Sequence, residues 1–185
     1  MSGNGHNRGP DLNGASWRSH CWRVARAELL GPRLPVEVVR TRVARAKALG
    51  LDYRTYAGVR ATTGRDLVAF LFSSNGLGVF RDGRALAPDR AAKLADLAAA
   101  RHLGAAPGLN AAALGAQIGA ASARALPPFG TSWGAMRTEM KGWLASQGLP
   151  GDAVLMIGET DHEAEMMAAG GLAGFVTGQR YFAAG

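Results

Sequence analysis

Four carboxylates stand close together in the stretch VLMIGETDHEAEMMAAGG, which covers residues 154–171. They are Glu159, Asp161, Glu163 and Glu165. The apolar run before them predicts a buried strand, and the residues after them predict a helix. Because Glu159 and Glu163 lie four residues apart across that turn, both could face one Mg²⁺ ion, which prefers oxygen ligands. The sequence therefore suggests a metal site at this pair, with Mg²⁺ as the one cofactor indicated.

The same carboxylates also fit a purely structural role. Acidic side chains are favoured in the first turn of a helix because the amino end of its dipole is positive. Thr160 or Asp161 would then cap the helix by accepting a backbone N–H. We favour this capping interpretation over the metal site, since such caps are common.

Apolar patterns along the chain predict the elements that would position these residues. Strands are expected at 67–75, 153–158 and 174–178, with a weaker one at 102–106. Helices are expected between them, at 89–103, 110–123, 132–148 and 162–171. Because strands and helices alternate, the predicted fold class is α/β. We expect a small, mainly parallel Rossmann-like sheet of three or four strands, flanked by helices, with an α-helical N-terminal extension.

The first third of the chain has a different pattern. Residues 1–16 are rich in Gly and Asn and predict a disordered leader. Residues 17–64 predict a basic helical extension with helices at 17–30, 35–49 and 53–63, and residues 65–185 predict the α/β domain. Gly50 is expected to end the second helix and Asp52 to cap the third. The predicted buried faces consist of Val36, Val39, Val43, Ala46 and Leu49 in the second helix, and of Trp133, Met136, Met140 and Trp143 in the helix at 132–148.

Composition excludes several classes of protein. With 185 residues and 48% hydrophobic residues, the chain is long and apolar enough for one folded core. No run of 18 apolar residues predicts a membrane span, and the N-terminus lacks the apolar region of a secretory signal. The lone Cys21 suits a reducing compartment, so we expect a cytoplasmic protein. No Cys or His residues stand at the spacing of a zinc site.

The charge of the chain is uneven. Residues 1–101 carry 17 Lys and Arg against 8 Asp and Glu, whereas residues 102–185 carry 4 against 6, and the net charge is +7. A basic front half could bind a nucleic acid or a protein partner. We favour the alternative, a solvated basic surface, because net charge alone does not identify a partner. The composition does not indicate an oligomeric state.

The segment at 36–61 resembles a helix-turn-helix, in which a short turn lets the second helix enter the major groove of DNA. In that interpretation Arg54, Thr55 and Arg60 would contact the bases, and Arg42 and Arg45 would contact phosphates. The alternative is two surface helices that dock on the sheet through their apolar faces. We favour docking, because an apolar face must be buried with or without DNA.

A further resemblance covers residues 67–178. The stretch MIGETDHEAEMMAAGGLAGFV resembles the fourth motif of the haloacid dehalogenase-like hydrolases, an apolar strand followed by Gly-Asp-x-x-x-Asp and a helix ending in Ala-Gly. LVAFLFSSN at 67–75 resembles the family's second motif, an apolar strand that ends in Ser or Thr. The resemblance places Ser73 or Ser74 at a phosphate-binding position, and Lys93 or Arg90 at the position of the third-motif base. It implies a Mg²⁺-dependent phosphate-ester hydrolase.

The chain also departs from this family. Nothing before residue 67 matches the first motif, an apolar strand ending in Asp-x-Asp that supplies the nucleophile. Glu159 and Glu163 replace the two aspartates of the fourth motif, and Lys93 lacks its usual neighbouring proline. We therefore expect a non-catalytic binding or regulatory domain that resembles a degenerate module of the family. A DNA-binding protein and a Mg²⁺-dependent phosphohydrolase are the two alternatives.

Overall fold

The computed structural model describes residues 34–183, and the chain divides into two compact units, residues 1–40 and residues 41–185. In the described part of the first unit, the Arg40 guanidinium lies 2.8 Å from the Glu37 carboxylate, one helical turn away. The predicted leader at 1–16 and the predicted helix at 17–30 lie outside the described residues.

The second unit is built on a five-stranded sheet in which every neighbouring pair of strands is parallel. The strand order is β3-β2-β1-β4-β5, so the first strand lies at the centre. The strands are β1 (Ala69–Ser73), β2 (Ala100–Ala105), β3 (Ser122–Ala125), β4 (Val154–Gly158) and β5 (Gly174–Thr177). The expected α/β fold with a parallel sheet is confirmed, with five strands instead of the three or four predicted.

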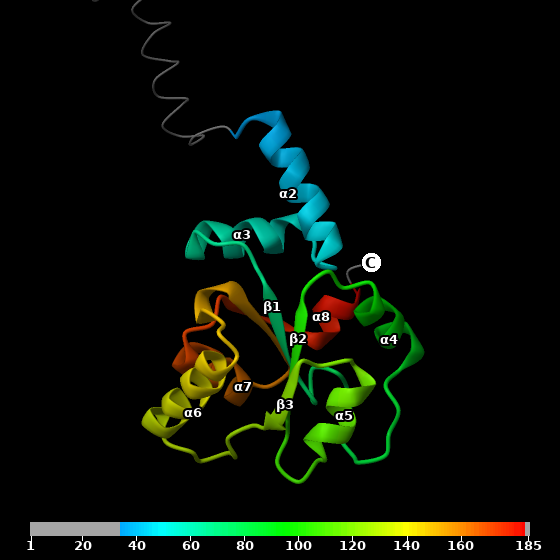
Figure 1. Ribbon diagram of the computed structural model, residues 1–185, viewed down its shortest axis with the longest axis vertical. Coiled ribbons are helices and arrows are strands. Elements are labelled where there is room, and N and C mark those ends of the chain that lie inside the picture. Colours follow the sequence, from blue (N-terminus) through cyan, green and yellow to red (C-terminus); the bar gives the residue numbers. More distant parts are fainter. Residues whose placement is uncertain (1–33, 184–185) are drawn as a thin grey trace, which may run out of the picture. The chain divides into compact units, whose positions relative to one another are not determined.

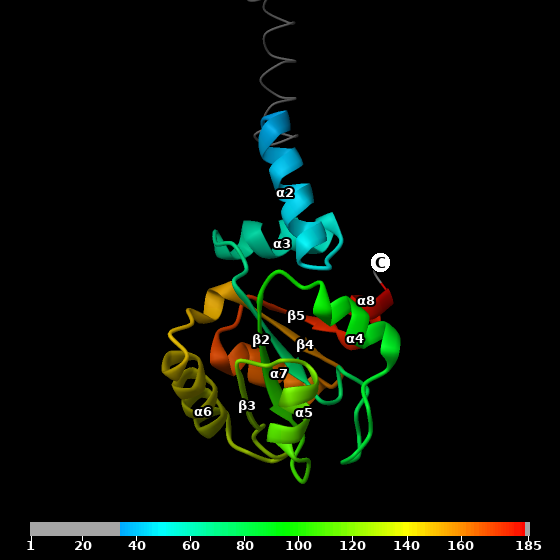
Figure 2. The same cartoon turned by 45° about the vertical axis from the view of Figure 1, so that its right-hand side comes forward.

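Helices connect the strands and cover both faces of the sheet. Figures 1 and 2 show α6 and α7 on one face and α4, α5 and α8 on the other. The helical elements are α2 (Val36–Ala48), α3 (Tyr53–Thr63), α4 (Pro88–Ala95), α5 (Ala111–Gln117), α6 (Trp133–Ser146), the 3-10 turn η1 (Gly151–Ala153), α7 (Asp161–Gly170) and α8 (Gly178–Ala183).

The two central strands are buried on both faces, as their continuous apolar sequences predict. Phe70 and Phe72 of β1 pack in one hydrophobic cluster with residues of α3, α4, α5 and α8. Leu71 of β1 and Met156 of β4 point to the other face, where they pack with residues of α6 and α7. The chain therefore forms three layers, with a separate apolar core on each side of the sheet.

The corner between α2 and α3 agrees with its sequence signals. Gly50 adopts a left-handed φ of 61° after α2, and Asp52 caps α3 by accepting the Thr55 N–H at 2.8 Å. Ala46 and Leu49 are buried in the core, whereas Val43 is 46% exposed. The predicted apolar stripe of α2 is therefore buried at its C-terminal end, and it is exposed at Val43 and, in the first unit, at Val36.

Four local predictions are corrected by the structure. Residues 122–125 form the edge strand β3 where a helix over 110–123 was predicted, because parallel pairing with β2 overrides the helix preference of alanine. The helix predicted at 89–103 ends at Ala95, since the amides of Ala98 and Ala100 donate to carbonyl groups outside the helix. The segment after β5 forms α8, which was not predicted. Trp133, the first residue of α6, is 50% exposed, whereas the other three residues predicted on that inner face are buried.

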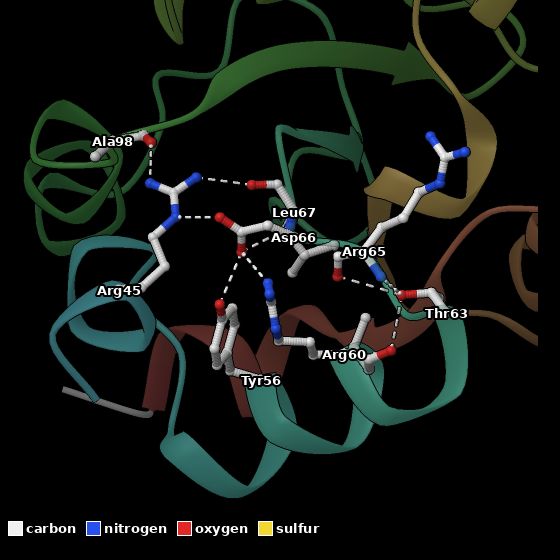
Figure 3. Close-up of polar contacts among 9 residues, drawn as sticks. Arg45, Tyr56, Arg60, Thr63, Arg65, Asp66, Leu67 and Ala98 are labelled. Carbon is white, nitrogen blue, oxygen red and sulfur yellow. Dashed lines mark hydrogen bonds and ion pairs between the residues drawn. The ribbon is translucent and has the colours of Figure 1, made fainter. Parts of the chain in front are cut away.

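A carboxylate at the start of β1 joins the helical corner to the sheet, as Figure 3 shows. Asp66 accepts hydrogen bonds from Arg45 Nε at 3.0 Å, from the Tyr56 hydroxyl at 2.8 Å and from the Leu67 amide at 3.0 Å. Arg60 lies 3.7 Å from the same carboxylate. The Arg45 guanidinium also donates to the Leu67 carbonyl at 2.8 Å and to the Ala98 carbonyl at 3.2 Å. Arg45 and Asp66 thus fix the ends of α2 and α3 to the start of the sheet.

The pKa of the Asp66 carboxyl reflects these contacts. Burial raises this pKa, but the Tyr56 hydrogen bond and the Arg45 guanidinium lower it by more, so it lies below the ordinary value of 3.8. A carboxyl with a depressed pKa stabilises the fold above its unfolded pKa. That stabilisation is lost as the pH falls through the lower pKa of the folded state.

We predict that Asp66→Asn lowers the free energy of unfolding at neutral pH by about 1–2 kcal/mol, since it removes charge-assisted hydrogen bonds at a side chain that is 39% exposed. Urea denaturation measures the change, with Glu139→Gln on the exposed side of α6 as the control. The difference in the free energy of unfolding between the variant and the wild type should shrink when the pH falls below the ordinary aspartate pKa. If this difference is absent at neutral pH, or is the same at all pH values, Asp66 does not have the role described.

Candidate ligand cavity at the carboxyl edge of the sheet

The carboxyl ends of β1 and β4 meet at one edge of the sheet, because these strands are parallel neighbours. Ser73 and Ser74 at the end of β1 are fully buried. The Ser73 hydroxyl oxygen accepts the Gly76 N–H at 2.8 Å, and the Ser74 hydroxyl oxygen accepts the Ala106 N–H at 2.9 Å. Both predicted phosphate-binding hydroxyl groups therefore hold backbone turns of this edge. Their assignment to phosphate stays a prediction.

Glu163 is the central polar residue of the edge, and it is only 2% exposed. Its Oε2 accepts the backbone N–H groups of Glu159 at 2.7 Å and Thr160 at 3.0 Å. Its Oε1 accepts the Asn75 side-chain amide at 3.0 Å, so the carboxylate joins the end of β1 to the turn after β4. The Thr160 hydroxyl accepts the Glu163 N–H in return, which completes a capping box and confirms the predicted cap at Thr160.

Two glycines let the backbone approach closely enough to form this arrangement. A Cβ on Gly158 would lie 2.9 Å from Glu163 Oε2 and 2.6 Å from the Phe175 ring. A Cβ on Gly178 would lie 2.0 Å from the Gly76 carbonyl oxygen. Only glycine fits at positions 158 and 178, because a side chain there would displace the loops that hold Glu163.

The two glutamates of the suggested metal site have different surroundings. Glu163 is buried among N–H donors, whereas Glu159 is exposed and accepts the Gln179 N–H at 3.3 Å at the start of α8. Within residues 34–183, no group of three or more His, Cys, Asp or Glu side chains is placed to hold a metal ion. Mg²⁺ binding by Glu159 and Glu163 stays a prediction. In the observed geometry, the partners of the Glu163 carboxylate are N–H groups.

A cavity of about 390 Å³ opens beside Glu163. Its described lining consists of Asn75, Ala106, Pro107, Leu126, Pro127, Phe129, Thr160, His162, Glu163 and Met166. These residues come from the loops that follow β1, β2, β3 and β4, and from α7. Ligands of parallel α/β sheets bind at this edge, where loops from several strands converge. None of the lining residues in the described part of the chain is Lys or Arg.

One wall of the cavity contains an aromatic side chain and an imidazole. The Phe129 ring lies 5.5 Å from the His162 ring in an edge-to-face arrangement, and Phe129 is 90% exposed. His162 Nε2 lies 3.3 Å from the Pro127 carbonyl oxygen, which only accepts hydrogen bonds, so this nitrogen carries a proton. Nδ1 of the same ring lies 3.7 Å from the Glu165 carboxylate.

Lys93 lies away from this edge. Its ammonium donates to the Tyr181 carbonyl at 2.5 Å and lies 4.6 Å from the centre of the Tyr181 ring. Burial lowers the pKa of this lysine. It lines a larger cavity of about 580 Å³ between the α2–α3 corner, α4 and α8, together with Lys47, Asp52, Asp89 and Asp96. The smaller cavity, in contrast, lies where the loops after four of the strands converge.

The residues proposed to contact DNA have mixed surroundings. Arg45 and Arg60 contact Asp66, as described above. The Thr55 hydroxyl donates to Asp52 at 2.6 Å and accepts from Arg180 at 2.8 Å. Arg54 is exposed on α3 and Arg42 is half-buried on α2. Three of the five candidate contacts thus hold parts of the chain together, and DNA binding stays a prediction.

His102 is a buried polar residue that the sequence did not single out. Its Nδ1 lies 2.8 Å from the Ser122 hydroxyl, which also accepts the Trp143 indole N–H at 2.9 Å. Burial lowers the pKa of the imidazole. This residue fastens β2 and β3 to α6 and lines neither of the two cavities.

Sequence reasoning missed several residues of the candidate site. Asn75 follows a buried strand directly, which is a signal that could have identified it. His162 stands within the acidic stretch, but its sequence position does not indicate contact with Pro127. Phe129 lies after a Pro-Pro pair in a loop, and a loop sequence does not show which cavity the loop covers.

Comparison with known proteins found no matching family model, no matching curated protein and no matching solved structure. Between residues 34 and 183, no helix is both long and apolar enough to cross a membrane.

We predict that Asn75→Asp destabilises the protein in the absence of divalent cations, because it places a second carboxylate about 3 Å from Glu163. Millimolar Mg²⁺ should restore much of the lost stability, since an ion bound only by the folded state raises its stability. Thermal denaturation with and without Mg²⁺ measures both effects. Asn75→Ala serves as the control, because it removes the N–H donor without adding charge. Mg²⁺ should not restore the stability of this variant. If Mg²⁺ stabilises the wild type as strongly as Asn75→Asp, Glu163 is a metal ligand.

Proposed function

We propose that this chain is a non-catalytic binding or regulatory α/β domain whose ligand occupies the cavity at the carboxyl edge of the sheet. The proposal rests on the hydrogen bonds of Glu163. Its carboxylate is buried and accepts three N–H donors of the protein itself. A carboxylate in this state is a structural group. The cavity beside it has the size and the mixed polar and apolar lining of a small-molecule site.

The hydroxyl groups of Ser73 and Ser74 add support. A nucleophilic serine requires an exposed oxygen and an adjacent general base. Both serines are fully buried, and both oxygens accept backbone N–H groups. His162 lies in the cavity, but its Nε2–H is directed to the Pro127 carbonyl. The described residues of the cavity therefore offer no activated nucleophile for ester hydrolysis.

We also propose that the domain has the architecture of a degenerate haloacid dehalogenase-like module. The residues at 34–68 contain no strand, so within the described chain β1 is the strand on which a first motif would stand. This assignment is an alternative to the second-motif assignment made from the sequence, which stays a prediction. Ser73 and Asn75 would then occupy the positions of the two first-motif aspartates, which removes the nucleophile and one carboxylate. The Asn75 amide donates to Glu163, where two carboxylates would need a cation between them.

DNA binding is not proposed as a second function. A DNA-reading helix must present side chains that can reach base edges. On α3, Thr55 and Arg60 contact other parts of this chain, and the exposed residues around Arg54 include Gly58 and Ala61. The basic charge of residues 1–101 remains compatible with an acidic partner.

We predict that the purified protein does not hydrolyse p-nitrophenyl phosphate above a protein-free blank in the presence of millimolar Mg²⁺. The physical reason is that the described cavity lining contains no Lys or Arg for the phosphoryl oxygens, and that the two serines of the edge are buried with their oxygens bound to backbone N–H groups. Release of p-nitrophenolate measures the reaction, and Glu159→Ala is the matched variant. Hydrolysis well above the blank in the wild type, lost in Glu159→Ala, would replace the proposal with the Mg²⁺-dependent hydrolase.

A further inference from the structure

We propose that the cavity at the carboxyl edge binds a small organic cation with a compact apolar body, such as a quaternary ammonium compound. This inference rests on the proposed function, because it names the class of ligand for the same cavity. Three features support it: the charge of the lining, the occupied amino end of α7, and the exposed aromatic ring at the wall.

The charge of the lining favours a cation. Glu163 is the one carboxylic side chain among the described lining residues, and none of them is Lys or Arg. Asp161 and Glu165 are exposed on the adjacent first turns of α7 and add negative charge near the cavity. Arg90 approaches this edge from the opposite face of the sheet, where it donates to the Gly76 carbonyl at 3.2 Å and lies 4.8 Å from the Phe182 ring.

The amino end of α7 is partly occupied by side chains of the protein itself. A helix amino end normally binds anions through its free N–H groups. Here Glu163 Oε2 accepts the N–H groups of Glu159 and Thr160, and the Thr160 hydroxyl accepts the Glu163 N–H. An anionic ligand at this position would lie beside the Glu163 carboxylate and could not use the N–H groups of Glu159 and Thr160. Like-charge repulsion therefore disfavours phosphate and carboxylate ligands here.

The apolar part of the lining suits a cation whose charge is spread over methyl groups. Leu126 and Met166 line the cavity and are buried. The Phe129 ring lies edge to face with His162 and is 90% exposed, so most of its surface is open to a ligand. Quaternary ammonium groups bind aromatic faces through cation–π attraction without requiring hydrogen-bond acceptors. A volume of about 390 Å³ accommodates such a molecule.

The test uses a pair of probes with the same shape and different charge, choline and 3,3-dimethyl-1-butanol. Each is titrated into the ¹⁵N-labelled full-length protein, and the amide resonances of Asn75, Thr160 and His162 report binding. We expect choline to bind roughly tenfold more tightly than the alcohol. Phe129→Leu keeps the apolar volume and should remove most of that difference. Trp133→Leu is the matched control, because Trp133 is also exposed but does not line the cavity.

Three results would overturn this inference. If the alcohol binds as tightly as choline at the same amides, the cavity binds ligands without regard to charge, and the binding-domain proposal stands. If inorganic phosphate shifts these amides and choline does not, the site selects anions. If the same amides shift when the protein alone is concentrated, a second copy of the chain occupies the cavity. Failure of the proposed function is measured separately, by hydrolysis of p-nitrophenyl phosphate.

Discussion

A buried carboxylate must be matched by donors or by a cation, and the arrangement of the carboxyl edge follows from how Glu163 meets this requirement. An uncompensated charge at a side chain that is 2% exposed would cost several kcal/mol. Two backbone N–H groups and one side-chain amide compensate it here, and each charge-assisted hydrogen bond contributes about 1.5–3 kcal/mol. The donors come from the loop after β1 and the turn after β4. Glu163 therefore fixes the relative positions of two adjacent strand ends.

The hydrogen bonds of Glu163 also limit the chemistry of the edge. Because Asn75 supplies an N–H donor, Glu163 has a partner without a metal ion. The carboxylate accepts the N–H groups of Glu159 and Thr160 just before α7, so these donors are not available to a ligand. The cavity beside it is lined by an exposed phenyl ring, apolar side chains and a few polar side chains. The residue that joins the two strand ends is thus also the carboxylate that lines the cavity.

The elements around this edge were predictable from local sequence signals. The continuous apolar runs at 67–75 and 153–158 indicated β1 and β4, and the Thr160-x-x-Glu163 spacing is the sequence pattern of a capping box. β3 was not predictable, because its alanine-rich sequence favours a helix and only pairing with β2 makes it a strand. The network around Asp66 was also beyond sequence reasoning, since Arg45 and Asp66 are 21 residues apart.

The cavity itself depends on long-range geometry. Its lining joins loops after four different strands, and no single segment carries a recognisable pattern for it. The acidic stretch suggested two carboxylates around one ion because the spacing of Glu159 and Glu163 permits it. In the fold the two side chains point in different directions. The Glu163 carboxylate is buried and accepts backbone N–H groups, whereas the Glu159 carboxylate accepts an N–H group at the start of α8. Spacing along a turn does not determine whether two side chains converge.

The most direct measurement of the central claim is amide hydrogen exchange at Glu159 and Thr160, compared between the wild type and Glu163→Ala. If the Glu163 carboxylate accepts these two N–H groups, both are protected in the wild type. Their exchange should accelerate roughly ten- to hundredfold in the variant, while the amides of Leu155 and Met156 within β4 stay slow. Added Mg²⁺ should leave the wild-type exchange rates unchanged. Equal exchange of Glu159 and Thr160 in the two proteins, with β4 intact, would contradict the account.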